Sequence, residues 1–258
     1  MKSLFQLALV GMLLALSIPG TAGTVLVVAD EFEQMEILKT YMKEHGDYHL
    51  ELLEQDEFPD TISQEFDGVI EFVHGKLRDD VAKAIIDYTL AGGRTVVLHH
   101  GVSSGKKNTK GWYDFLGMEL DRAEGAENYY YWMHDVEFYM VNLNPNHFIT
   151  SHNVKYSHGV SYRPSDAPST MANFAGIRFI DSEVFVNHQF TDGREKTVLF
   201  GFKFKNPKTS ETIMQDRSGW YKPKGDGYVF YFHPGHTVED FKHENYCQII
   251  LNAFEWKP

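Results

Sequence analysis

The sequence has very little cysteine, since Cys247 is the one thiol in 258 residues. A lone thiol excludes an intramolecular disulfide, a four-cysteine zinc site and an iron–sulfur cluster. Cys247 shares an apolar helical stripe with Ile250 and Phe254, which predicts an unreactive thiol in the core. Any metal site would therefore depend on histidine and carboxylate ligands.

Positive charge is also scarce. Lysine and arginine total 24 against 36 aspartate and glutamate residues, a formal net charge of −12. A chain this acidic has no general electrostatic attraction to nucleic acid or to an anionic membrane. Hydrophobic residues make up 43% of the chain, which excludes a disordered or collagen-like protein. We expect a globular protein with a small-molecule ligand and no nucleic-acid partner.

A long apolar run occurs at the amino terminus. Lys2 supplies a positive start, residues 4–18 are mostly apolar, and small residues precede a cleavage site after Ala22. This pattern predicts a signal peptide over residues 1–22 and a mature chain over 23–258, exported to the periplasm or the extracellular space. A membrane anchor is the alternative, but a span needs about 20 apolar residues. No cysteine follows the run, which excludes a lipoprotein anchor, so we expect no membrane contact after cleavage.

Valine-rich runs and helical patterns alternate along the first hundred mature residues. Such runs are typical of strands buried on both faces, and the helical patterns between them stop at glycines. Strands are expected over 24–29, 48–53, 68–73 and 95–98, and helices over 33–45 and 77–88. This order predicts right-handed βαβ units, a parallel sheet and an open, doubly wound α/β domain.

The pattern changes between residues 118 and 168. Aromatic residues, histidine, asparagine and proline there predict irregular structure or short antiparallel strands laid over the sheet. Further strands are expected over 136–142, 183–186, 197–204 and 228–232, and a last helix over 238–256. No linker and no internal repeat interrupts the sequence, so we predict one domain.

Acids or histidines follow four of the predicted strands. Ligands of open parallel sheets bind beyond the carboxyl ends of the strands, where loops meet helix N-termini. A single histidine at a strand end is more often a structural residue, but four such ends together favour a functional site. The residues concerned are Asp30, Glu31, His74, His99, His100, His233 and His236.

The segment from residue 96 to 105 is a strand that turns sharply at small residues, the arrangement by which α/β enzymes present a nucleophile. Here the turn presents the imidazoles of His99 and His100. A Ser–His pair using Ser103 or Ser104 is an alternative, although G-x-S-x-G is absent.

Carboxylates and aromatic residues add further candidates. Asp181 and Glu183 flank Ser182 before an apolar run, and either could serve as an acid or base or face solvent. The aromatic residues over 129–132, together with Trp112, Tyr113 and Trp220, could stack on sugar rings or pack beneath the insertion.

Six segments resemble, in the right order, motifs of the ThuA-like trehalose-utilisation family, a relative of class I glutamine amidotransferase-like folds. The segments are 66–70 (FDGVI), 91–99 (AGGRTVVLH), 112–117 (WYDFLG), 144–150 (NPNHFIT), 180–185 (IDSEVF) and 225–236 (GDGYVFYFHPGH). The resemblance implies a flavodoxin-like, three-layer, doubly wound and mostly parallel sheet with a central insertion. It also implies a link to carbohydrate catabolism, especially of trehalose-like or oxidised (keto) disaccharides.

Carried over residue by residue, the resemblance points to His99, His147, Asp181, Glu183 and His236. The chain departs from the family pattern in its acidic stretch at residues 30–33, where the family often has histidine, and at Phe148 and Tyr228, which replace proline and arginine. Amidotransferase activity is not implied, because the cysteine nucleophile of those enzymes is missing.

These observations favour an exported enzyme that hydrolyses or isomerises a sugar derivative without a cofactor. The expected proton-transfer residues are His99, His236 and Glu183, which we predict to lie in one pocket. The residues expected to bind substrate are Asp30, Glu31, His74, His100, His147, Asp181, Trp112 and Trp220.

Two alternatives stay open. One is a carbohydrate-binding or envelope protein without turnover. The other is a hydrolase in which two or three histidines hold zinc and leave a position for water. No HExxH-like spacing supports the zinc alternative. Its candidate ligands are His99, His100, His233 and His236.

Overall fold

The computed structural model describes residues 22–121, 123, 125–126, 128–165 and 170–258. Apart from Ala22, the predicted signal peptide over residues 1–22 lies outside the described residues. Within the described ranges, no helix has both the length and the apolar character needed to cross a membrane.

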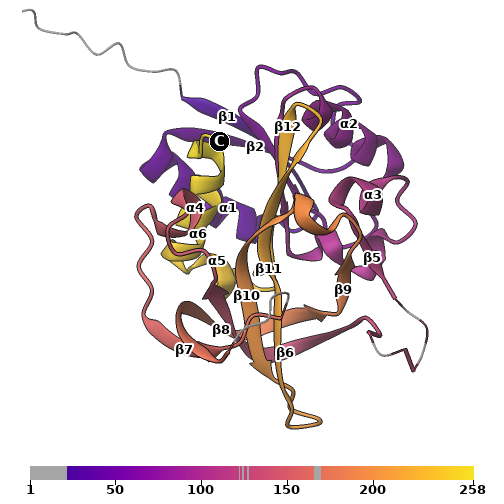
Figure 1. The fold of residues 1–258 in the computed structure, drawn as a ribbon. Helices are drawn as coiled ribbons and strands as arrows, with labels where there is room; N and C mark the ends of the chain where they lie inside the picture. Colours follow the sequence, from indigo (N-terminus) through magenta and orange to yellow (C-terminus); the bar gives the residue numbers. More distant parts are fainter. Residues whose placement is uncertain (1–21, 122, 124, 127, 166–169) are drawn as a thin grey trace, which may run out of the picture.

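Ten strands of the described chain form one large sheet, in the order β2-β1-β3-β4-β12-β11-β10-β6-β8-β7 (Figure 1). Neighbouring strands are parallel over the first five: β2 (Tyr48–Leu53), β1 (Gly23–Ala29), β3 (Gly68–Phe72), β4 (Arg94–Leu98) and β12 (Gly227–Phe232). From β12 onward every pairing is antiparallel: β11 (Thr212–Lys224), β10 (Thr197–Lys205), β6 (Tyr131–Asn142), β8 (Ala172–Val186) and β7 (His158–Tyr162). A small second sheet pairs β5 (Met118–Leu120) with β9 (His188–Phe190).

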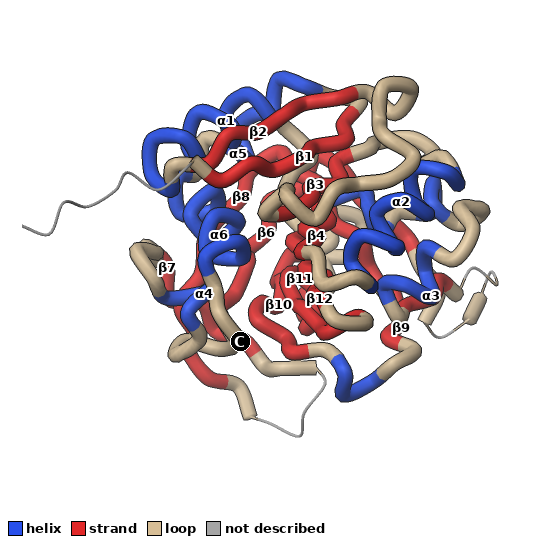
Figure 2. The backbone as a smooth tube through the Cα atoms, turned by 90° about the horizontal axis from the view of Figure 1, so that it is seen from above, coloured by secondary structure: helices blue, strands red, loops and turns tan. Residues whose placement is uncertain are grey.

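Helices cover both faces of the sheet, as the view from above shows (Figure 2). One face carries α1 (Phe32–Gly46), α4 (Phe148–Ser151), α5 (Val238–Phe241) and α6 (Glu244–Glu255). The other face carries α2 (Asp79–Leu90) and α3 (Trp112–Leu116). Short 3-10 turns complete the fold: η1 (His99–Val102), η2 (Ser104–Lys106) and η3 (Gly193–Glu195).

Strand β1 explains why the first apolar run is continuous. Successive side chains of a strand point to opposite faces. Val25 and Val27 pack in the core beside α1 and α6, whereas Leu26 and Val28 pack in the core beside α2. Both faces of β1 are buried, so polar residues do not alternate with apolar ones along the run. The predicted α/β fold, a doubly wound sheet between helix layers, is confirmed.

The structure differs from the sequence prediction in the second half of the chain. Within the region 118–168, which was expected to lie over the sheet, the described strands β6 and β7 instead extend the sheet. Strand β11 was not predicted, because charged residues and Pro223 break its alternation. The last helix, expected over 238–256, is divided into α5 and α6 at Lys242–His243.

The parallel strands bring their carboxyl ends to one edge. Register pairs Ala29 with Phe72 and Leu98 with Phe232. The residues that follow β1, β3, β4 and β12 therefore lie along the same rim of the sheet, which is where ligands of such folds bind.

Candidate functional site

His99 stands in a tight turn at the end of β4, with a left-handed φ of 43°. Such a conformation costs a non-glycine residue on the order of 1–3 kcal/mol and is found mainly at functional sites. The turn also needs Gly101, because a Cβ there would lie 2.1 Å from Val97 Cγ1 and 2.5 Å from Glu71 Oε2. The elbow predicted from the sequence is therefore present, and it turns His99 inward.

Glu183 reaches the same place from the antiparallel half of the sheet. The register of β8 against β6 shifts between Val136 and Phe138, where Ile180 and Asp181 form a bulge, and Asp181 has φ 53°. After this bulge Glu183 is buried, and its side chain is 6% exposed. Bulges re-aim the side chains beside them, and here the result is a carboxylate at the rim.

Three imidazoles converge on one oxygen of this carboxylate. Glu183 Oε2 lies 3.1 Å from His99 Nε2, 3.1 Å from His100 Nε2 and 3.3 Å from His236 Nδ1. The four ligand-type atoms all lie within 4.8 Å of one another. We call these four residues the Glu183 cluster. The structure brings His99, His236 and Glu183 together, although His99 does not line the pocket that was predicted for all three.

The charges of the cluster follow from burial and from these contacts. Burial alone would raise the pKa of Glu183, but its contacts with His100, His236 and His99 hold that pKa well below the usual range. Burial, together with the neighbouring His99, lowers the pKa of His100 to about 3. Interaction with the Glu183 carboxylate raises the pKa of His236. At neutral pH Glu183 is therefore an anion and His100 is neutral.

The protonation of His99 is constrained by its second contact. His99 Nδ1 lies 2.7 Å from the carbonyl oxygen of His233, and a carbonyl can only accept, so Nδ1 carries the proton. A neutral His99 would then turn the bare lone pair of Nε2 toward the Glu183 carboxylate at 3.1 Å. Two lone pairs at this distance repel unless a proton or another cation lies between them. The gap between His99 Nε2 and Glu183 Oε2 is therefore a place for a proton or another cation.

Asp240 positions the loop that carries His236. Its Oδ2 accepts hydrogen bonds from His236 N at 2.9 Å, Gly235 N at 3.0 Å and Ser182 Oγ at 2.7 Å. Asp240 is buried, and it forms a capping box with Thr237 at the start of α5. Asp240 was not among the predicted site residues, although the spacing Thr237-x-x-Asp240 is a capping signal.

A second clamp holds the loop after β3. Asp30 accepts hydrogen bonds from the backbone nitrogens of His74 at 2.6 Å and Gly75 at 3.1 Å. From the other side, the buried Lys106 ammonium donates to the carbonyl oxygens of Val73 and Gly75. Asp30 was predicted to bind substrate, but its carboxylate binds the backbone of this loop instead. Lys106 was not among the predicted site residues.

This loop places His74 against the cluster. The His74 ring contacts His100 at a tilt of 36°, with ring centroids 3.9 Å apart, and His74 Nδ1 lies 3.1 Å from Glu31 Oε1. His74 and Glu31 are both partly exposed, and of the two only His74 lines the pocket described below.

A pocket of about 380 Å³ opens above the cluster. Of the four cluster residues, His100, Glu183 and His236 line it, whereas His99 is fully buried beneath. His100 therefore faces the pocket in the place where His99 was expected, because the left-handed turn sends the first imidazole inward and the second outward. The other lining residues are His74, Ser103, Ser104, Gly105, Tyr130, Trp132, His134 and Phe185.

Several predicted residues lie elsewhere. Trp112 and Trp220 are fully buried in the core beside α2, so neither offers a face to a sugar, and the prediction for them is corrected. Asp181 is exposed at the bulge, where its left-handed backbone conformation allows the strand to bend. His147 caps α4 by accepting from Ile149 N at 3.2 Å, and its ring contacts Tyr221 and Trp256 rather than the cluster.

His233 is also outside the cluster. Its Nε2 accepts a hydrogen bond from Phe185 N at 3.2 Å, and burial lowers its pKa to about 3. This neutral imidazole ties β8 to the end of β12, so the zinc alternative loses one of its candidate ligands. Cys247 is buried as predicted, and its thiol donates to Phe241 O at 3.1 Å.

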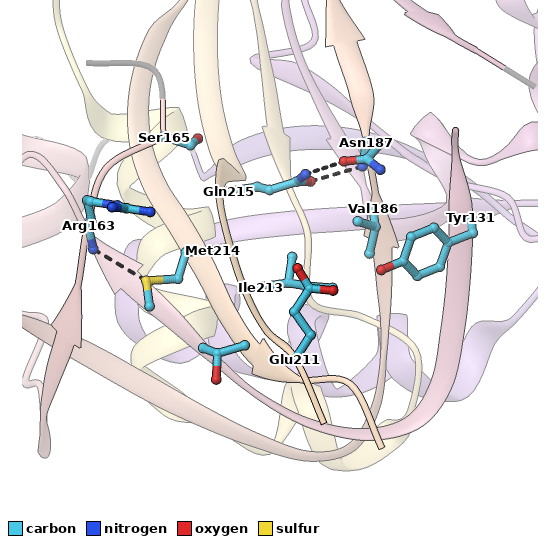
Figure 3. Close-up of a pocket in the computed structure, with 10 residues that line it drawn as sticks. Tyr131, Arg163, Ser165, Val186, Asn187, Glu211, Ile213, Met214 and Gln215 are labelled. Atoms are coloured by element: carbon cyan, nitrogen blue, oxygen red, sulfur yellow. Dashed lines mark hydrogen bonds between the residues drawn. The ribbon is translucent and has the colours of Figure 1, made fainter. Parts of the chain in front are cut away.

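Another pocket, of about 440 Å³, lies between β6, β8 and β11 (Figure 3). Its central polar groups are the amides of Asn187 and Gln215, which hydrogen-bond to each other. No histidine lines it among the described residues. Because these amides already hydrogen-bond to each other, this pocket is a weaker candidate for a reaction centre than the pocket above Glu183.

Comparisons with known proteins agree with this fold. The profile of the ThuA family, described as trehalose utilisation, matches residues 23–257. A comparison with curated protein sequences finds no match. Among solved structures, a ThuA-like protein from Bacteroides uniformis superposes with a TM-score of 0.59 at 18% identity, covering 93% of this chain and 92% of that chain.

Two further solved structures give lower TM-scores. A β-galactosidase from Bacillus circulans gives a TM-score of 0.51 at 11% identity, covering 91% of this chain and 31% of that chain. A glutamine amidotransferase from Thermotoga maritima gives 0.44 at 11% identity, covering 91% of this chain and 96% of that chain. The likeness to the β-galactosidase is one of fold alone. The profile match over residues 23–257 is the stronger finding, and by it the chain belongs to the ThuA family of trehalose utilisation.

Proposed function

We propose that this ThuA-family protein is an exported enzyme that hydrolyses or isomerises a neutral sugar or keto-sugar derivative at the Glu183 cluster. The observation that carries the proposal is the convergence of three imidazoles on one buried carboxylate oxygen beneath an open pocket. Perturbed ionisable groups gathered in a pocket are typical of reaction centres. The family description, trehalose utilisation, supports a sugar as the substrate.

The roles follow from exposure and charge. His236, with a quarter of its side chain exposed, faces the pocket, and its pKa is raised by Glu183, so it is the proton donor. His100 also lines the pocket and is neutral at pH 7, so it is suited to accept a proton or a hydroxyl hydrogen bond. Glu183 keeps both rings oriented and stabilises positive charge on them. His99, beneath, is a positioning residue.

The test is turnover of a panel of neutral disaccharides and keto-sugars by matched histidine variants. His236→Gln should lower turnover by roughly 10²–10⁴, the usual contribution of a positioned acid or base. His147→Gln is the control, because His147 is a half-buried histidine away from the cluster and should retain turnover. Equal turnover by wild type and His236→Gln would refute the proposed role.

A second candidate, a metal-dependent version of this enzyme, is favoured by the His99 geometry. A metal-ligating histidine commonly donates its other nitrogen to a backbone carbonyl, as His99 does to His233. Ligands bound tetrahedrally to zinc at about 2.0–2.1 Å are about 3.3–3.4 Å apart. The three distances to Glu183 Oε2, 3.1–3.3 Å, are close to this value.

The cluster residues therefore fit a divalent cation held by His99, His100, His236 and Glu183. When bound, such an ion supplies Lewis-acid polarisation of a carbonyl or activation of water. Calorimetric titration of Zn²⁺ into chelator-treated protein distinguishes the two versions. Tight binding by wild type that is lost in Glu183→Gln supports the metal version, whereas turnover unaffected by chelation supports proton transfer alone.

A further inference from the structure

Trp132 is an exposed aromatic residue beside the cluster that the proposed chemistry does not use. Half of its surface is accessible, whereas Trp112 and Trp220 are fully buried. It lines the same pocket as His100, Glu183 and His236. A large indole left accessible in a pocket is a typical contact for a ligand with an apolar face.

The sheet register fixes where this indole lies. Trp132 in β6 pairs directly with Phe185 in β8, and paired residues of antiparallel strands share one face. Phe185 in turn packs against the rings of His99 and His100, with centroids 4.9 and 5.5 Å apart. Glu183 is two residues before Phe185 in the strand, so it lies on this face too. One cross-strand pair therefore separates Trp132 from the cluster.

The surroundings indicate the kind of ligand. No lysine or arginine is among the described residues that line this pocket, so it offers no permanently charged group to bind a phosphorylated or carboxylated ligand. Ser103, Ser104 and His134 line the same pocket and can exchange hydrogen bonds with hydroxyl groups. A neutral pyranose ring, with an apolar C–H face and hydroxyl edges, matches an indole bordered by such groups.

We propose that Trp132 is the platform of a second sugar subsite, on which the non-reacting ring of a neutral disaccharide stacks while the other ring faces the Glu183 cluster. This inference rests on the proposed function and adds the residue that distinguishes a disaccharide from a monosaccharide. Tyr130, whose ring centroid lies 6.5 Å from that of Trp132, supports the platform from the core side.

The experiment is calorimetric titration of the full mature chain with trehalose and with glucose as probes. Trp132→Ala should weaken trehalose binding by roughly 10-fold and leave glucose binding nearly unchanged, because only the longer sugar reaches the indole. Trp132→Phe, which keeps an aromatic face, should lose less. Tyr129→Ala is the matched control, because Tyr129 is also exposed but does not line the pocket.

The outcomes separate the two proposals. Equal trehalose affinity in wild type and Trp132→Ala overturns the subsite, and so does an equal loss in Tyr129→Ala or the absence of binding of either sugar to wild type. The proposed function is tested independently, through turnover by His236→Gln on the wider panel. If the titrations show no subsite at Trp132 but turnover still depends on His236, the proposed function stands.

Discussion

Replacing Asp240 by alanine tests whether the buried carboxylate builds the site. The Asp240 side chain accepts three close hydrogen bonds, from Ser182 Oγ, Gly235 N and His236 N. Hydrogen bonds to a charged group contribute about 1.5–3 kcal/mol each, and buried donors left unpaired lose a similar amount. The terms do not add, because water can reach the partly exposed His236 loop. We therefore expect Asp240→Ala to lower the free energy of unfolding by about 3 kcal/mol.

The assay is urea unfolding followed by circular dichroism, together with turnover at a temperature where the variant is folded. Glu239→Ala is the matched control, because the neighbouring Glu239 side chain is 70% exposed and should change stability by less than about 0.5 kcal/mol. Turnover should fall in Asp240→Ala as His236 moves. If both variants unfold at the same urea concentration, Asp240 does not hold the loop and the reasoning is wrong.

Three further predictions concern the thiol, the charge of the cluster and the amino terminus. Cys247→Ala should cost on the order of 1 kcal/mol of stability and leave activity intact, because the thiol is buried and its pKa is raised to about 12; inactivation of the folded variant would contradict this. Glu183 raises the pKa of His236, so the stabilisation is complete below about pH 6.5 and is lost as pH rises through the folded-state pKa. Wild type should therefore exceed His236→Gln in unfolding free energy more at low pH than at high pH, and a gap that widens toward high pH would reverse the assignment. Mass spectrometry of exported protein should find Gly23 as the first residue, whereas Met1 retained in a membrane fraction would count against cleavage.

The parallel half of the fold could be predicted because its information is local. Strand β2 was predicted over Tyr48–Leu53, where the structure has it, and the runs before Asp30 and His99 end where the sequence indicated. A strand buried between two helix layers is a continuous apolar run, so its burial can be predicted from its own residues. Its polar end residues are therefore also visible in sequence.

The remainder of the site depends on long-range geometry. Asp181 looked like a substrate ligand, but its left-handed backbone makes the bulge that aims Glu183 at the cluster. The sequence around Lys106 gives no signal of burial, yet backbone carbonyls from the loop after β3 bind its buried side chain. Trp112 and Trp220 read as candidate platforms, and only the packing of α3 and β11 shows that they are core. Contacts between residues far apart in sequence have no local signature.

The central claim is that Glu183 organises the reaction centre, and turnover by Glu183→Gln tests it most directly. Glutamine has the same size as glutamate but lacks the charge that both the proton-transfer and the metal version require. We expect turnover of the sugar that wild type converts to fall by roughly 10²–10⁴ in a variant whose near-ultraviolet circular dichroism matches wild type. Wild-type turnover by folded Glu183→Gln would contradict the account and move the reaction centre away from this cluster.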